Sequence, residues 1–133
     1  SMAASKISAY DEVRQALLGL QRRLGGQGAV VLEGRDIGTV VFPNADIKFY
    51  LTATVESRAR RRLVELEEKG TYIEFEEVKR QVTERDKGDM EREFAPLRKA
   101  ADAIEVDTTA MTVEQVVNML IALVEERRKQ LGL

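Results

Sequence analysis

A short apolar run that stops abruptly sets the first limit on how this chain folds. Residues 29–32 read Ala-Val-Val-Leu, as in a buried strand, and residues 33–36 read Glu-Gly-Arg-Asp. The pattern predicts a strand over 29–32, with Arg35 and Asp36 directly beyond its end. In open α/β sheets, ligands bind in the crevice outside the carboxyl ends of the strands. An arginine fork there suits a phosphate, and a neighbouring carboxylate can accept from an amino or hydroxyl group. An Arg–Asp pair that only closes the loop on itself is the alternative.

The remaining sequence alternates helical and strand-like segments. Thr54 and Gly70 fit the two ends of one helix, and Thr112 with Gln115 fits a capping box at the start of the last one. Apolar periodicity predicts helices over 10–24, 55–69 and 75–88 and from 113 onward, and strands over 29–32, 47–51 and 103–107. This order is typical of an α/β fold.

Composition excludes several classes of chemistry. The 133 residues fit one domain, and the net charge of −2 does not favour DNA or an anionic membrane as a partner. The absence of cysteine and histidine removes disulfides, thiolate metal sites and the commonest general base. No apolar run approaches the length of a membrane span, and the start does not resemble a signal peptide, so a cytoplasmic location is expected. An anion site must therefore come from locally gathered arginines.

The first arginine cluster lies in the predicted helix 55–69. Arg58 shares a helix face with Arg61 and Arg62, and like charges at that spacing repel unless an anion or a carboxylate lies between them. A phosphate would satisfy the cluster. Glu65, with the glutamates that follow it, offers the simpler alternative of a neutralised, solvated helix, which the residues alone favour.

The second cluster is Arg85, Asp89 and Arg92, spaced at i, i+4 and i+7. A continuing helix would align them on one face, where they would form either a ligand site or an ion-pair ladder that contributes a few tenths of a kcal/mol per pair. Gly88 costs such a helix about 1 kcal/mol relative to alanine, which a purely structural ladder would not require. A third segment, Asp-Thr-Thr at 107–109, is interpreted as a turn that precedes the cap at Thr112.

Residues 33–43, Glu-Gly-Arg-Asp-Ile-Gly-Thr-Val-Val-Phe-Pro, resemble the corresponding segment of bacterial cytidylate (CMP) kinases, and the resemblance continues to the last helix. That family begins with a strand and a Gly-rich P-loop, whereas no G-x-x-x-x-G-K-[ST] motif occurs in this sequence. The resemblance therefore implies an incomplete P-loop nucleoside monophosphate kinase fold. It would have a parallel sheet with flanking helices, a helical lid at about 55–90, and no P-loop strand.

The resemblance also implies a reaction and a set of site residues. The reaction is transfer of the γ-phosphoryl group of ATP, bound with Mg²⁺, to CMP or dCMP. Asp89 would contact the ribose hydroxyls. Arg92 and Asp36 together would contact the edge of the cytosine base. The residues implied in phosphate binding and catalysis are Arg35, Arg85, Arg58 and Arg62. Gly88 and Met90 depart from family members that carry arginines at these positions, so fewer cations surround the site here.

Two other functions remain open. One is a nucleotide-binding fragment that is inactive alone because the P-loop is missing, and the other is a helical interaction module built on the Glu/Arg-rich helices. No metal ligand in this chain, no nucleic acid and no membrane are expected among its partners. Without the P-loop strand, the sheet would have unpaired apolar edges, so strand exchange or self-association is expected for the chain alone.

Overall fold

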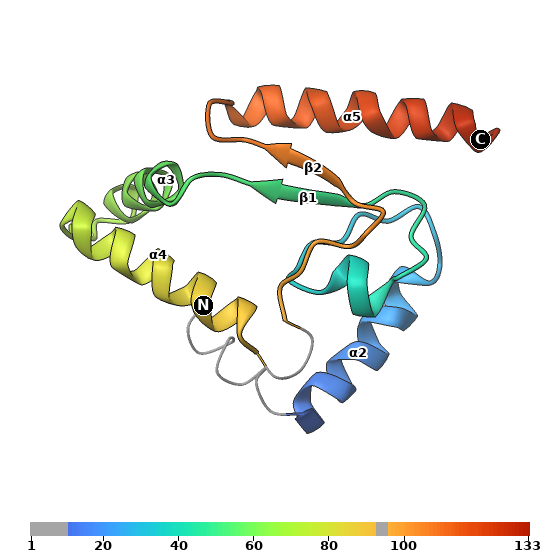
Figure 1. Ribbon diagram of the computed structural model, residues 1–133, viewed down its shortest axis with the longest axis horizontal. Helices are drawn as coiled ribbons and strands as arrows, with labels where there is room; N and C mark the ends of the chain where they lie inside the picture. The colour runs from blue at the N-terminus through green and yellow to red at the C-terminus, as the bar shows by residue number, and fades with distance from the viewer. Residues whose placement is uncertain (1–10, 93–95) are drawn as a thin grey trace. The chain divides into compact units, whose positions relative to one another are not determined.

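The computed structural model describes residues 11–92 and 96–133, and Figure 1 shows its helices and strands. The architecture is mixed α/β. In chain order, the elements are α2 (Asp11–Gly25), a π-helical turn η1 (Ile37–Val41), β1 (Phe49–Thr52), α3 (Val55–Glu68), α4 (Phe75–Met90), β2 (Ile104–Asp107) and α5 (Val113–Gln130). They form two compact units. The first unit comprises 1–45 with 88–100, and the second comprises 46–87 with 101–133.

A two-stranded parallel sheet lies in the second unit. Strands β1 and β2 pair from Phe49↔Ile104 to Thr52↔Asp107, which confirms both strand predictions to within two residues. The pairing extends beyond the ladder at both ends, where Ile104 N donates to Lys48 O and Thr108 N to Thr52 O. Parallel neighbours require a crossover connection, and α3 and α4 provide it between these two strands (Figure 1).

The helix ends in the second unit follow the capping signals in the sequence. The Thr54 side chain accepts from Ser57 N at the start of α3, and both halves of the Thr112–Gln115 capping box are present at the start of α5. After α3, Gly70 adopts a φ of 80°, which glycine tolerates better than other residues. These three predictions are confirmed.

The strand predicted over 29–32 is wrong. These residues pair with no strand in the described part of the chain, and Val31 is 98% exposed. Gly28 and Ala29 both have positive φ, at 81° and 51°, so the backbone leaves α2 in a turn rather than in an extended path. A β-branched run forms a stable strand only when a neighbouring strand accepts its hydrogen bonds, and none does so here. Arg35 and Asp36 therefore do not follow a strand end.

A π-helical turn follows Arg35 and Asp36, and the sequence did not predict it. Val41 N donates to Asp36 O at 3.2 Å and Phe42 N to Ile37 O at 2.7 Å, which is the i→i−5 pattern of a π-helix. Such turns are rare and recur at functional sites. The predicted turn at 43–46 does follow it, with Ala45 N donating to Phe42 O.

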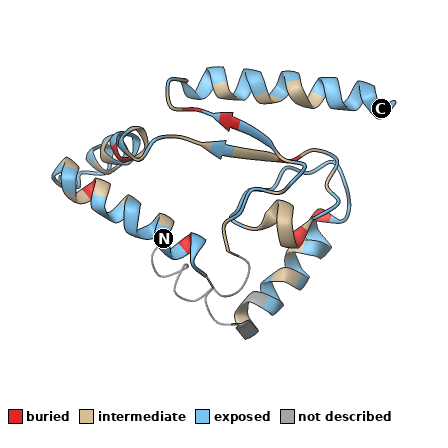
Figure 2. Cartoon of the chain, viewed as in Figure 1, coloured by how far each residue is buried: buried red, intermediate tan, exposed pale blue. Residues whose placement is uncertain are grey.

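Burial is sparse along the described chain (Figure 2). The buried apolar side chains there are Val41, Ala59, Val78 and Val106. No residue of α5 is buried, although its Val116, Leu120, Leu123 and Val124 share one half-covered face. Among the described residues, no helix is both long enough and apolar enough to cross a membrane.

Gly88 gives the first testable prediction, because it is exposed inside α4 and an added Cβ there would meet nothing within 4 Å. Gly88→Ala should raise the free energy of unfolding by about 0.5–1 kcal/mol, as alanine restricts the unfolded chain and favours the helix. Urea unfolding monitored by far-UV circular dichroism measures the change. Gly70→Ala is the matched control, since its Cβ also has open space but its φ of 80° disfavours alanine, so it should destabilise the chain. Destabilisation by both substitutions would contradict this interpretation of Gly88.

Candidate functional site

Arg35 and Asp89 meet in the first unit, although 54 residues separate them in the sequence. Arg35 Nε donates to Asp89 Oδ2 at 3.0 Å. The Asp89 side chain is only 7% exposed, whereas that of Arg35 is 41% exposed. Asp89 therefore holds one edge of a guanidinium that remains open to solvent. Among the described residues, Arg35 Nη1 and Nη2 donate no hydrogen bond.

The i, i+4, i+7 ladder expected for Arg85, Asp89 and Arg92 does not form. Helix α4 ends at Met90, so Arg92 lies beyond it, and Asp89 pairs with Arg35 instead of with either arginine of the ladder. Leu97 N donates to Asp89 O at 2.8 Å, which ties the following segment back to the helix end. Helix α4 thus ends before it reaches Arg92, and periodicity alone cannot reveal this end.

Two further predicted site residues of the first unit, Asp36 and Arg92, are half-buried. Asp36 lies directly before η1, and its carbonyl accepts from Val40 N and Val41 N. The Nε of Arg92 is a buried donor with no hydrogen-bond partner in the described structure. Buried donors in native proteins are nearly always paired, so an unpaired one requires an explanation such as a ligand.

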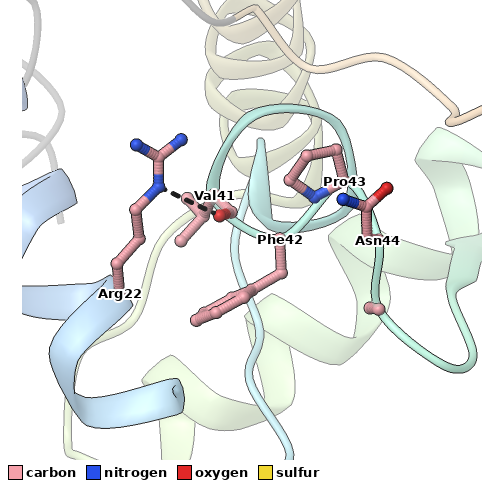
Figure 3. A pocket seen from close by; sticks show the side chains of 6 residues that line it. Arg22, Val41, Phe42, Pro43 and Asn44 are labelled. Atoms are coloured by element: carbon pink, nitrogen blue, oxygen red, sulfur yellow. Dashed lines mark hydrogen bonds between the residues drawn. The ribbon is translucent and has the colours of Figure 1, made fainter.

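Helix α2 fixes the position of η1, as Figure 3 shows from close by. Arg22 donates from Nε to Val41 O at 3.2 Å and from Nη2 to Val40 O at 2.9 Å. The ring of Phe42 packs so closely on Gly25 that a Cβ at Gly25 would lie 2.5 Å from a ring carbon. Arg22 also lines an open pocket with residues 41–45. This role of Arg22 was not predicted, because nothing in the local pattern of a helical arginine reveals a partner 19 residues away.

The arginine cluster in α3, in the second unit, is neutralised from within the chain. Arg58 donates from both terminal nitrogens to Asp86, with Nη2 to Oδ1 at 2.7 Å. Arg60 lies 5.9 Å from the centre of the Phe75 ring, Arg61 donates to Thr108 O at 2.6 Å, and Arg62 to Glu65 Oε2 at 2.7 Å. Internal partners thus relieve the repulsion between these arginines. The sequence offered two alternatives for this cluster, a bound phosphate or neutralisation by the glutamates that follow it. Among the described residues, a following glutamate pairs only with Arg62.

Arg85 and Asp86 are neighbours in α4 with contrasting surroundings. Arg85 is exposed and makes no hydrogen bond or ion pair with the part of the chain that the structure describes. Asp86 is half-buried and holds Arg58. Asp86 was not among the predicted site residues. Its partner lies 28 residues away on another helix, so only the tertiary structure identifies it.

The Asp-Thr-Thr segment at 107–109 connects β2 to α5, as expected for a turn before the cap. Thr108 is buried, donates to Thr52 O and accepts from Arg61. The Thr109 hydroxyl and backbone N–H both donate to Asp107 Oδ1 and lower the pKa of that carboxyl. At the other end of the sheet, the side chain of buried Lys48 donates to Asp102 at 2.8 Å and lowers the pKa of the Asp102 carboxyl. Both arrangements are structural.

The described residues contain no group of three or more carboxylate side chains that could hold a metal ion. The structure thus brings together Arg35 and Asp89, and it pairs Arg58 and Arg62 with carboxylates. The arrangement can present guanidinium groups to phosphate oxygens and carboxylates to hydroxyl or amino groups.

Comparison with known proteins assigns the family. The family model for cytidylate kinase matches residues 1–126. The cytidylate kinases of Syntrophotalea carbinolica and Citrifermentans bemidjiense are 49% and 50% identical over 129 residues, which is 97% of this chain and 55% of each relative. That of Carboxydothermus hydrogenoformans is 52% identical over 124 residues, 93% of this chain and 56% of the relative. The chain therefore spans about half the length of the curated relatives it matches. Because the cytidylate kinase model matches residues 1–126 of these 133, the chain belongs to the cytidylate kinase family.

Proposed function

We propose that this chain supplies the monophosphate site and the lid of a cytidylate kinase, which transfers the γ-phosphoryl group of ATP to CMP or dCMP. Phosphoryl transfer needs positioned cations and a magnesium ion rather than a histidine or cysteine, so a chain that lacks both residues is compatible with it. The observation that carries the proposal is the pairing of buried Asp89 with Arg35 Nε, while the Arg35 side chain remains 41% exposed.

Arg35 is the proposed phosphate ligand of the first unit. Asp89 engages Nε, the two terminal nitrogens donate no hydrogen bond within the described residues, and the side chain is 41% exposed. Two terminal N–H groups in a fixed plane match two oxygens of a phosphate. The carboxylate therefore orients the fork without occupying its phosphate-binding edge.

Asp89, Arg92 and Asp36 are proposed to recognise the nucleoside. An ionised carboxylate accepts from ribose hydroxyls or from the cytosine amino group, which is the role assigned to Asp89 and Asp36. Arg92 is assigned to the cytosine edge. Its buried Nε has no partner among the described residues, which supports a ligand contact. A nucleoside carbonyl that accepted from this nitrogen would remove an unfavourable buried donor.

The second unit contributes the lid, at about 55–90, with Arg58, Arg62 and Arg85 as its phosphate-binding arginines. Arg85 is exposed, and Arg62 makes only an exposed pair within one helix, of a kind that contributes little to stability. Both can therefore turn to a phosphate at small cost. ATP and its Mg²⁺ would be held mainly by a P-loop, and these 133 residues contain no such motif.

Exposed apolar side chains fit a sheet that continues beyond this chain in the complete fold. Val30 and Val31 lie in the unpaired segment, and Leu51 and Ile104 are exposed on the two strands. Contact with the P-loop strand of the family fold would cover such residues. The alternative function, a nucleotide-binding fragment that is inactive alone, is favoured by the missing P-loop motif. The proposed location is the cytoplasm and the proposed partners are the nucleotides; self-association is proposed for the chain on its own.

Calorimetric titration of the chain with CMP and, separately, with ATP tests the proposal. Binding of CMP alone is expected, because the proposed monophosphate residues are present and the P-loop motif is not. Binding of both nucleotides would indicate a donor site within these residues. Binding of neither would reject the nucleotide site and favour an interaction module.

Asp36 gives a prediction about base selectivity. Asp36→Asn should reduce the preference for CMP over UMP, because the exocyclic group that differs between the bases is a donor in cytosine and an acceptor in uracil. An asparagine amide can donate to the uracil carbonyl, whereas a carboxylate cannot. The measurement is the ratio of the two dissociation constants, compared with that of Asp46→Asn, an exposed aspartate in a loop of the second unit. An unchanged ratio would show that Asp36 does not read the base.

A further inference from the structure

Asp86 occupies the edge of Arg58 that a phosphate would need. Arg58 Nη1 and Nη2 donate to the two oxygens of Asp86, so the terminal fork of the guanidinium is saturated by one carboxylate. Carboxylate and phosphate present the same pair of acceptors to this fork. Arg58 cannot bind both groups through that edge at the same time.

Among the described ion pairs of α3 and α4, this is the bidentate pair that joins the two helices, and its side chains are 38% and 22% exposed. Lys79 and Glu56 also join them, but through one contact at 3.5 Å, with side chains 35% and 65% exposed. The pair of Arg62 with Glu65 lies within one helix, with side chains 49% and 56% exposed, and the pairs of Arg80 with Glu77 and Glu84 also lie within one helix. A two-pronged, partly buried pair between helices is the strongest of these, since solvent screens exposed pairs.

We propose that Asp86 is a positioning residue that holds Arg58 away from phosphate and is displaced when a polyphosphate binds. This rests on the proposed role of Arg58 as a phosphate ligand of the lid. Asp86 acts as an internal substitute for the phosphate, so anion binding at Arg58 is an exchange of one bidentate partner for another. The exchange lowers the affinity of the lid for polyphosphate and makes its engagement depend on an anion that outcompetes Asp86.

The test is titration of the chain with inorganic tripolyphosphate, which carries no base or ribose. Asp86→Asn should tighten tripolyphosphate binding by at least about fivefold, because a neutral amide competes less well for the guanidinium. Asp86→Glu retains the carboxylate and should return the affinity to within about twofold of the unsubstituted chain. Glu77→Gln is the matched control. It removes one negative charge from the same helix, next to Arg80, and should change the affinity by less than about twofold.

A double-mutant cycle separates this exchange from general effects of charge. In an Arg58→Ala background, Asp86→Asn should no longer change tripolyphosphate affinity. If Asp86→Asn reduced the helical signal by circular dichroism, Asp86→Ser would replace it. Weaker or unchanged tripolyphosphate binding by Asp86→Asn or Asp86→Ser in the chain that retains Arg58, or no tripolyphosphate binding by any variant, would overturn the proposal.

CMP titration of the unsubstituted chain and of the same variants tests the proposed monophosphate site separately from the exchange of Asp86 for polyphosphate at Arg58. CMP binding through Arg35 with no effect at Asp86 would leave the proposed function standing and reject the exchange. No CMP binding by the unsubstituted chain, together with tighter tripolyphosphate binding by Asp86→Asn, would support the exchange at Arg58 and reject the proposed monophosphate site.

Discussion

Arg35→Ala is expected to weaken CMP binding by about 10- to 100-fold and to leave cytidine binding nearly unchanged. Loss of a charge-assisted contact between a guanidinium and a phosphate costs about 1.5–3 kcal/mol, which corresponds to this range. Cytidine has no phosphate, so its contacts do not involve the outer edge of Arg35. Calorimetry measures the dissociation constants of CMP and of cytidine for the variant and for the unsubstituted chain, and each ligand gives one ratio of variant to unsubstituted chain.

Arg23→Ala is the matched control for Arg35→Ala. Arg23 is an exposed arginine of the same unit, in the last turn of α2, and its removal changes the net charge by the same amount. It should reduce CMP affinity by no more than about twofold. Equal losses of CMP and cytidine binding in Arg35→Ala would place Arg35 away from the phosphate.

Asp89→Ala is expected to affect both stability and ribose recognition. A solvent-exposed pair within one helix would contribute little to stability, but Asp89 is buried and holds Arg35. The substitution should therefore lower the free energy of unfolding by about 1–2 kcal/mol, with the loss limited because Arg35 remains hydrated. Affinity should fall further for CMP than for dCMP, since the proposed contact is with the ribose hydroxyls.

Asp89→Asn separates the two effects. An asparagine carbonyl can still accept from Arg35 Nε, so stability should be largely retained while the negative charge is lost. The measurements are urea unfolding, for stability, and titration with CMP and with dCMP, for ribose recognition. Equal weakening of CMP and dCMP in both variants would mean that Asp89 acts only by orienting Arg35. Unchanged stability in Asp89→Ala would contradict the structural role of the pair.

Local signals in the sequence predicted much of the second unit. A threonine before an apolar helical pattern, with glutamine three residues into it, is sufficient to identify the cap at Thr112, because capping depends only on neighbouring residues. The strands around Phe49 and Val106 were also found, since their apolar runs are short and bounded by turn residues. These features depend little on distant contacts.

The first unit was predicted less well because its structure depends on distant partners. Residues 29–32 have strand-like composition, but a strand needs a neighbour, and in residues 11–92 and 96–133 no adjacent strand accepts their hydrogen bonds. The π-turn at 37–41 is held by Arg22 and by the packing of Phe42 on Gly25, neither of which a local pattern reveals. Tertiary contacts therefore decide the conformation of the segment that follows Arg35 and Asp36.

In the candidate site too, local sequence identified residues, whereas their contacts depend on distant parts of the chain. Residue type and spacing identified Arg35 and Asp89 as polar residues of interest, and the family resemblance gave them roles. Their partners did not follow from the sequence, because the ion pairs Arg35–Asp89 and Arg58–Asp86 join residues that are 54 and 28 positions apart.

Phosphoryl transfer from ATP to CMP, with and without a P-loop segment, tests most directly whether this chain supplies the acceptor half of a cytidylate kinase. Purified chain of residues 1–133 is incubated with ATP, Mg²⁺ and CMP, first alone and then with the P-loop segment of a related cytidylate kinase as a separate chain. No CDP is expected from the chain alone, and CDP should form when the segment is added, with the Arg35→Ala variant strongly impaired. CDP formation by the chain alone would contradict the account, because nothing in these residues replaces the loop amides and lysine that hold the donor phosphates.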